Sequence, residues 1–217
     1  MTRTKSADWP GLERGLVAIL RGVKPDEIGP VADALVEAGI PAIEIPLNSP
    51  DPFSSIEAMV KRHGDTTLIG AGTVLDVVSV DRLADAGGRL LVSPNVNAAV
   101  LARAAHHHMV TMPGVFTPTE ALAALQAGAS ALKFFPASVL GAAGIAAIRA
   151  VLPSDCVVGA VGGVSENDFA TYLEKGVDVF GLGSSLYKPG LSAKEVGARA
   201  TKAVAAWDAL VKGEFRV

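Results

Sequence analysis

The sequence has little of several residue types, and each scarcity excludes a class of protein. One cysteine, Cys156, stands in 217 residues. A disulfide framework and a cysteine metal cluster are therefore excluded, and a reducing cytoplasm is expected. Aromatic residues make up 5% of the chain, and its 19 basic residues, set against 22 acidic ones, form no block. A nucleic-acid-binding surface, which needs clustered Lys and Arg, is not expected.

Long hydrophobic runs are also missing, although 50% of the residues are hydrophobic. No stretch approaches the ~20 apolar residues that a membrane-spanning helix needs. The first apolar run, Leu16–Leu20, is too short for the core of a signal peptide. We therefore expect a soluble cytoplasmic protein whose hydrophobic residues enter strands that are buried on both faces.

Short apolar runs alternate with amphipathic segments along the whole chain. The apolar runs begin roughly every 23 residues, which is the length of one strand, one short helix and two loops. The expected strands are Leu16–Leu20, Ala42–Ile45, Thr67–Gly70, Leu90–Ser93, Met109–Met112, Ala131–Phe135, Val157–Val161 and Val179–Gly183. The expected helices are Asp26–Ala38, Pro52–His63, Val77–Ala86, Ala98–His106, Thr119–Ala127, Ala143–Val151, Asn167–Lys175 and Lys194–Val211.

Local signals mark several helix ends. Thr117 and Glu120 have the spacing of a capping box at a helix start. Glycines follow five of the expected helices, at the position where a left-handed residue is wanted. These glycines are Gly39, Gly64, Gly87, Gly128 and Gly176.

Eight successive strand–helix units predict a single (β/α)8 barrel (TIM barrel) domain over residues 1–217, with residues 1–15 as a short cap segment below the barrel. An open doubly wound sheet is the alternative. That fold usually places a glycine-rich turn after its first strand, whereas this chain has Arg21–Lys24 there, so the barrel is favoured.

In such a barrel the active site gathers at the carboxyl ends of the strands. Lys133 is one of nine lysines and the only one that lies within an expected strand. Alternation places Lys133 and Phe135 on the inner face, where loss of hydration lowers the pKa of the amine. A free amine beside a carbonyl substrate forms a Schiff base. A lysine paired with a carboxylate for purely structural reasons is the alternative.

Glu44 lies between two isoleucines, so the same alternation turns it inward. An interior glutamate is costly unless it is paired or hydrogen-bonded. We expect it to act as a general acid and base beside Lys133. A static salt bridge with Lys133 or Arg21 is the alternative.

Glycines follow the last two strands, where this fold commonly binds phosphate through backbone N–H groups. Gly162 and Gly163 follow one strand, and Gly183 and Ser184 follow the other. Tight turns would also explain such glycines. The residues expected at the strand ends are Arg21, Glu44, Thr73, Pro94, Pro113, Gly114, Lys133, Gly162, Gly163, Gly183 and Ser184.

A metal site is not expected at the consecutive histidines His106–His108. Neighbouring helical side chains point about 100° apart and cannot converge on one ion. The three histidines also precede a strand, at the opposite end of the barrel from the expected site.

Five segments resemble motifs of one enzyme family, in the family's order and spacing. The family is that of the class I aldolases acting on 2-keto-3-deoxy-6-phospho sugar acids, and the resemblance covers about Leu16 to Trp207. The segments are Ala18–Gly22, Glu44–Pro50, Gly70–Val74, Ala131–Pro136 and Ala160–Val164.

The resemblance implies a homotrimer with no cofactor, in which Lys133 is the Schiff-base lysine and Glu44 shuttles protons. It further implies that Arg21 and Thr73 bind substrate anions and that the region of Gly162 and Ser184 binds phosphate. The strand-end and loop positions add a further set of expected substrate contacts: Pro94, Phe135, Val161, Gly163 and Gly183.

Within the family the match is closest to galactonate-specific members. Gluconate-specific members typically carry arginine where Asn48 stands, and threonine where Val161 stands. Val161 is therefore expected to contribute to the stereochemical preference at C4 of the substrate.

The expected reaction is cleavage of 2-dehydro-3-deoxy-6-phosphogalactonate to pyruvate and D-glyceraldehyde 3-phosphate, through an imine on Lys133. Cleavage of the gluconate epimer, or of both epimers, is one alternative. A phosphosugar isomerase or epimerase that uses Glu44 as its base is another, and a non-catalytic phosphosugar-binding protein is a third. Neither a nucleic-acid partner nor a membrane is expected.

Overall fold

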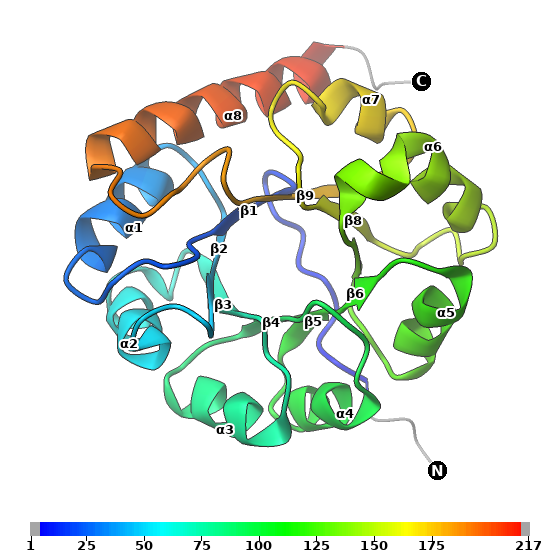
Figure 1. The fold of residues 1–217 in the computed structure, drawn as a ribbon, viewed down its shortest axis with the longest axis horizontal. Coiled ribbons are helices and arrows are strands. Elements are labelled where there is room, and N and C mark those ends of the chain that lie inside the picture. Colours follow the sequence, from blue (N-terminus) through cyan, green and yellow to red (C-terminus); the bar gives the residue numbers. More distant parts are fainter. Residues whose placement is uncertain (1–4, 214–217) are drawn as a thin grey trace.

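The computed structural model describes residues 5–213, in which parallel strands form a ring inside a layer of helices (Figure 1). The strands are β1 Leu16–Ile19, β2 Ala42–Pro46, β3 Leu68–Gly72, β4 Leu90–Val92, β5 Val110–Met112, β6 Gly114–Val115, β7 Leu132–Phe134, β8 Val158–Val161 and β9 Val179–Leu182. The helices are α1 Ile28–Glu37, α2 Pro52–His63, α3 Val77–Asp85, α4 Ala98–His106, α5 Pro118–Gln126, α6 Ala137–Arg149, α7 Phe169–Leu173 and α8 Ala193–Gly213.

The strands follow one another around the ring in the order β5-β4-β3-β2-β1-β9-β8-β7-β6. β5 and β6 are two halves of one strand, divided at Pro113, which has no N–H to donate to a ladder. The split strand still bonds to its neighbour, because Thr111 O accepts from Ala131 N at 3.0 Å and Pro113 O accepts from Lys133 N at 2.9 Å. These bonds close the ring, so the (β/α)8 barrel is confirmed and the open doubly wound sheet is wrong.

The strands carry apolar side chains on both faces, as buried parallel strands should. In β1, Leu16 and Ala18 join the cluster between strands and helices, whereas Val17 and Ile19 join a separate cluster inside the barrel. The period-two alternation therefore divides the core into an outer layer and a barrel interior. The interior cluster consists of Val17, Ile19, Ala42, Leu90, Val92, Val110, Met112, Ala131, Val161 and Val179.

Most of the expected helix-end signals are present. The side chain of Thr117 accepts from the Glu120 backbone N–H and that of Glu120 accepts from the Thr117 backbone N–H, which completes the capping box. Four of the five expected glycines have left-handed φ values between 79° and 94°, namely Gly39, Gly87, Gly128 and Gly176.

The expectation for Gly64 is wrong. Gly64 has φ −61° and continues the right-handed helix as its last partly helical residue. The turn that follows is closed differently, because Thr66 N and Thr67 N both donate to His63 O. Two N–H groups on one helical carbonyl end the helix without a left-handed residue.

The helix expected at Ala143–Val151 begins earlier, at Ala137. Its first turn is separated from the rest by Gly141, whose φ of 72° and ψ of 161° are not helical. Only glycine adopts this conformation readily, so Gly141 allows the kink between the two parts of α6.

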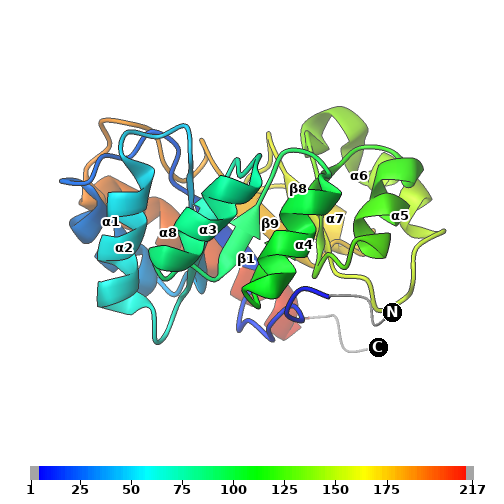
Figure 2. The same cartoon turned by 90° about the horizontal axis from the view of Figure 1, so that it is seen from below.

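The segment before β1 crosses one end of the barrel, where it can be followed as the purple-blue trace inside the ring in Figure 1 and below the strands in Figure 2. Ala7, Trp9 and Leu12 pack against the interior cluster, and Ala7 N donates to Met109 O at 3.0 Å. Residues 1–4 of the expected cap segment lie outside the described residues. Among the helices of the described residues, none is both long and apolar enough to cross a bilayer.

Candidate active site

Two charged side chains lie inside the barrel, Lys133 on β7 and Glu44 on β2. The side chains alternate across each strand, so both residues face the interior together with the inner apolar cluster. Lys133 is 5% exposed and Glu44 is 1% exposed. Burial to this degree is rare for charged residues and is costly, so the two side chains call for a functional explanation.

Glycines lie beside both interior charges on the neighbouring strands. Lys133 is in register with Gly114 on β6 and with Gly159 on β8. Glu44 is in register with Gly70 on β3. A side chain in a strand contacts the residues directly across on either side. Three of those neighbouring positions carry no side chain, and a Cβ at each would first contact the backbone or a methionine side chain rather than either charge.

Burial lowers the pKa of the Lys133 ammonium, because the charged form loses hydration. The charge of Glu44 opposes this shift, and the positive charge of Arg21 adds to it. The Lys133 Nζ also lies 4.8 Å from the centre of the Phe135 ring, which shields the amine from water on one side. A larger fraction of Lys133 is therefore free amine at neutral pH than for an exposed lysine.

Burial raises the pKa of the Glu44 carboxyl to about 7, and the positive charges of Lys133 and Arg21 only partly oppose that shift. Glu44 Oε2 is buried without a hydrogen-bond partner among the described residues. None of the ion pairs between described residues includes Glu44 or Lys133. The two groups influence each other without a static salt bridge, and Glu44 can exchange its proton near neutral pH.

Arg21 follows β1 at the mouth of the barrel, where it is exposed. Its Nη1 donates to the side-chain oxygen of Asn48, which follows β2. Gly22 N also donates to Ser49 Oγ at 2.9 Å. These two bonds join neighbouring loops and hold a guanidinium, a group suited to carboxylate or phosphate, above the interior charges.

Thr73 and Pro94 follow β3 and β4 at the same end, and both are half-buried. Thr73 has a φ of 57°, a left-handed conformation that is uncommon for a β-branched residue and that concentrates at functional sites. The carbonyl oxygen of Pro94 would lie 2.3 Å from a Cβ added at Gly114. The loop after β4 therefore packs closely on the split strand.

The predicted phosphate region lies beside Phe135. Gly162 and Gly163 have φ values of 93° and 73°, and a Cβ added at Gly162 would lie 3.0 Å from the Phe135 ring. Gly183 has open space around such a position, and Ser184 next to it is exposed. Glycine turns of this kind can direct backbone N–H groups toward an anion. Val161, at the end of β8, belongs to the interior cluster.

The expected residues thus gather at one end of the barrel, and the sequence did not indicate the glycines that lie in register with the two interior charges. The sequence predicted no role for Gly70 or Gly159 and placed Gly114 only among the residues at the strand ends, although each of the three is in register with one of the two interior charges. Aligning the expected strands Ala131–Phe135 and Val157–Val161 by their carboxyl ends would have brought Gly159 beside Lys133.

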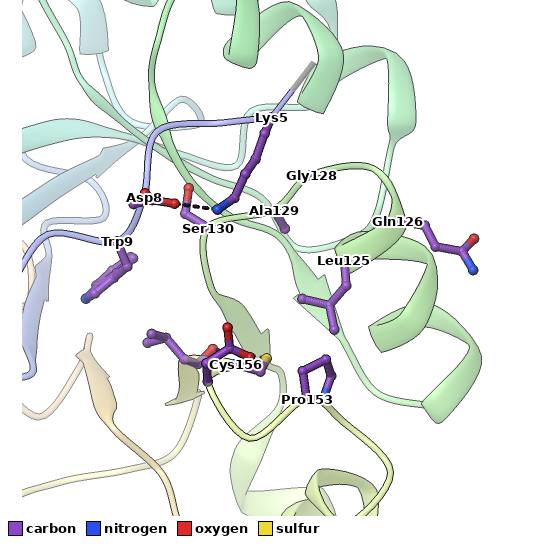
Figure 3. Close-up of a pocket in the computed structure, with 12 residues that line it drawn as sticks. Lys5, Asp8, Trp9, Leu125, Gln126, Gly128, Ala129, Ser130, Pro153 and Cys156 are labelled. Carbon is purple, nitrogen blue, oxygen red and sulfur yellow. Dashed lines mark hydrogen bonds and ion pairs between the residues drawn. The ribbon is translucent and has the colours of Figure 1, made fainter. Parts of the chain in front are cut away.

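A separate cavity of about 530 Å³ lies at the opposite end of the barrel (Figure 3). Trp9, Leu125, Pro153 and Cys156 line it; Leu125 lies in the last turn of α5, and the other three lie in segments that precede β1 or β8. Burial raises the pKa of the Cys156 thiol to about 11, so the thiol stays protonated and unreactive.

One of the consecutive histidines, His107, takes part in a polar contact between α3 and the end of α4. His107 Nε2 lies 2.7 Å from Asp81 Oδ1, which also accepts from Arg103 Nε at 2.5 Å. Across the described residues, no group of three or more His, Cys, Asp or Glu side chains is placed to hold a metal ion.

Comparison with known proteins gives the family. The family model described as "Aldolase: KDPG and KHG aldolase" matches residues 12–203. The chain belongs to the KDPG and KHG aldolase family. The resemblance seen in the sequence motifs is thereby confirmed, and with it the assignment as an aldolase, a carbon–carbon lyase.

Individual aldolases resemble the chain over nearly its whole length. A probable 2-dehydro-3-deoxy-6-phosphogalactonate aldolase of Rhizobium meliloti (strain 1021) is 64% identical over 94% of this chain and 97% of its own. The 2-dehydro-3-deoxy-6-phosphogalactonate aldolase of Escherichia coli (strain K12) is 48% identical over 88% of this chain and 94% of its own.

Solved structures also resemble this chain over most of its length. A structure described as native KDPGal superposes with a TM-score of 0.92 at 46% identity, over 94% of this chain and 99% of that one. A cube-shaped protein cage designed by fusing symmetric oligomeric domains matches with a TM-score of 0.91 at 46% identity, over 92% of this chain and 74% of that one.

The burial of Lys133 predicts that this functional lysine lowers the stability of the fold. We expect Lys133→Met to raise the free energy of unfolding at pH 6 by about 1–2 kcal/mol, because a buried amine is replaced by an apolar side chain of similar length. Glu44 then stays protonated, since the charge that lowered its pKa is gone. Urea unfolding of both proteins measures the change.

Lys188→Met is the matched control, because Lys188 is exposed at the same end of the barrel; it should change stability by less than about 0.5 kcal/mol. A loss of about 3 kcal/mol or more in Lys133→Met would show that a structural ion pair had been broken.

Proposed function

We propose that the chain is a Schiff-base aldolase that cleaves 2-dehydro-3-deoxy-6-phosphogalactonate to pyruvate and D-glyceraldehyde 3-phosphate. The observation that carries the proposal is the buried Lys133 amine, with its lowered pKa, facing the same interior as a carboxyl that titrates near pH 7. The names of the R. meliloti and E. coli relatives support the galactonate substrate.

The reaction begins with attack of the free Lys133 amine on the C2 ketone of the substrate. The carbinolamine that forms loses its hydroxyl as water, with a proton supplied by Glu44, and a protonated imine remains. A carboxyl with a pKa of about 7 is present in both forms at neutral pH, so it can donate this proton and later accept another.

The imine then accepts the electron pair of the C3–C4 bond. Glu44, now a carboxylate, takes the proton of the C4 hydroxyl, and D-glyceraldehyde 3-phosphate leaves. Glu44 returns that proton to C3 of the remaining enamine, and water hydrolyses the resulting imine to pyruvate and the Lys133 amine. Phe135, whose ring lies 4.8 Å from Lys133 Nζ, packs against the enamine and excludes water.

The other residues at the mouth bind the rest of the substrate. Arg21 and Thr73 are suited to its anionic groups, and the open turns after β8 and β9 are suited to its phosphate. Val161 closes the interior beside them and contacts the substrate near C4. The residues that we assign to substrate binding are Arg21, Thr73, Pro94, Phe135, Val161, Gly162, Gly163, Gly183 and Ser184.

No cofactor takes part in the proposed reaction, because the protonated imine supplies the electron sink. We propose a homotrimer, supported by the cage whose matching domain belongs to a design from symmetric oligomeric domains. Leu75, Val77 and Val78, at the start of α3, are 50%, 40% and 65% exposed, and such a cluster suits a subunit interface. The lone buried Cys156 supports a location in the cytoplasm.

The substrate proposal predicts faster pyruvate release from the galactonate epimer than from the gluconate epimer. We expect kcat/KM to differ by roughly tenfold or more, since the contact at C4 differs between the epimers by about one hydrogen bond or methyl group. Addition of EDTA should leave both rates unchanged. Equal rates with the two epimers would favour a dual-specificity enzyme. A higher rate with the gluconate epimer would overturn the proposed galactonate substrate. Exchange of substrate protons without release of pyruvate would indicate an isomerase.

The raised pKa of Glu44 predicts the pH dependence of kcat/KM, which reports groups in the free enzyme. Glu44 must be protonated to supply the proton that expels water, so kcat/KM should fall as the pH rises through about 7. Glu44→Gln should remove this limb and reduce kcat by about 10²–10⁴-fold.

Glu57→Gln, on the exposed face of α2, is the control and should keep the wild-type profile. If Glu44→Gln retains the limb and the turnover, Glu44 has no part in proton transfer.

A further inference from the structure

The carboxylate of Glu44 lies over the end of β3. Glu44 is in register with Gly70, and Pro46 is in register with Gly72. Gly72 is therefore two residues farther along the same inner face, in the direction in which the side chain of Glu44 leans.

The position of a side chain at residue 72 is already occupied. A Cβ added at Gly72 would lie 2.0 Å from Glu44 Oε2, and 2.4 Å from both Oε1 and Cδ. Distances below 3.0 Å are essentially never seen for real Cβ atoms. The three nearest atoms all belong to the Glu44 carboxylate, so even a methyl group at residue 72 must move that carboxylate.

The backbone does not account for glycine at this position. Gly72 is absent from the glycines with positive φ and continues β3 to its last residue, a conformation open to any amino acid. Gly70 differs, because a Cβ there would lie 1.8 Å from the backbone oxygen of Leu90. Gly70 is needed for strand packing, whereas Gly72 is needed for the carboxylate.

We propose that Gly72 is a positioning residue of the aldolase, which acts through Glu44 by leaving empty the space that its carboxylate fills. The inference rests on the proposed role of Glu44 as acid and base. A carboxylate at the end of a flexible side chain can move while the fold remains, so a methyl group at residue 72 should displace the proton-transfer group and preserve the barrel. Displacement of a reacting group by about 1 Å costs roughly 10²-fold in rate.

The first experiment is Gly72→Ala. We expect kcat for pyruvate release to fall about 10²-fold, while KM changes by less than about threefold, because the residues that bind the substrate anions are untouched. Gly29→Ala is the matched control: it adds the same methyl group on α1, where no heavy atom lies within 4 Å, and should leave kcat unchanged.

The second experiment is the double variant Gly72→Ala/Glu44→Asp. Aspartate is shorter by one methylene, so it draws the carboxylate away from the added methyl group. In the wild-type background Glu44→Asp should reduce kcat, because the carboxylate no longer reaches the substrate. In the Gly72→Ala background the same change should raise kcat by roughly tenfold, a coupling typical of residues in contact. A merely structural role of Gly72 would not reverse the sign of this effect.

Circular dichroism and thermal unfolding of all variants separate activity from folding. The proposal is overturned if Gly72→Ala keeps wild-type turnover, or if Glu44→Asp lowers kcat in both backgrounds. If Gly72→Ala does not fold, recovery of folding in the double variant supports a clash with Glu44, and failure of the double variant to fold overturns it. Unchanged turnover in Glu44→Gln would instead refute the role of Glu44 itself, which keeps the two failures distinct.

Discussion

The structure depends on one constraint, the burial of two opposite charges in a barrel interior without a direct salt bridge between them. Loss of hydration moves the two pKa values toward each other, upward to about 7 for Glu44 and downward for Lys133. A tight ion pair would have the opposite effect, because each charge would stabilise the other. Their separation therefore keeps a free amine and a carboxyl that can exchange protons in one dry site.

The barrel provides this arrangement through what its inner face lacks as much as through what it contains. Apolar side chains fill the lower interior, and glycines stand beside the two charges, with Gly114 and Gly159 flanking Lys133. Glycine weakens a strand, and an unpartnered carboxylate oxygen costs free energy. Both destabilising features lie at the mouth of the barrel, where reactivity is gained at the expense of stability. The two-layered core around the mouth stabilises the fold.

Much of the fold follows from sequence periodicity, and so does the inward orientation of Lys133 and Glu44, because alternation in a strand is a local property. Features that depend on tertiary contacts do not follow. The end of α2 at Gly64 is set by two N–H groups that both donate to the carbonyl oxygen of His63. The kink in α6 is set by the non-helical conformation of Gly141. The contact between Glu44 and Gly72 requires the register of two strands, which no single segment of sequence contains.

The central claim is that the Lys133 amine is the nucleophile, and borohydride trapping with pyruvate tests it most directly. Peptide mapping by mass spectrometry after reduction should find one added reduced pyruvate, on the peptide that contains Lys133. Lys133→Met should yield no adduct, while Lys188→Met should be labelled like the wild type. An adduct on another lysine, or labelling that persists in Lys133→Met, would contradict the account.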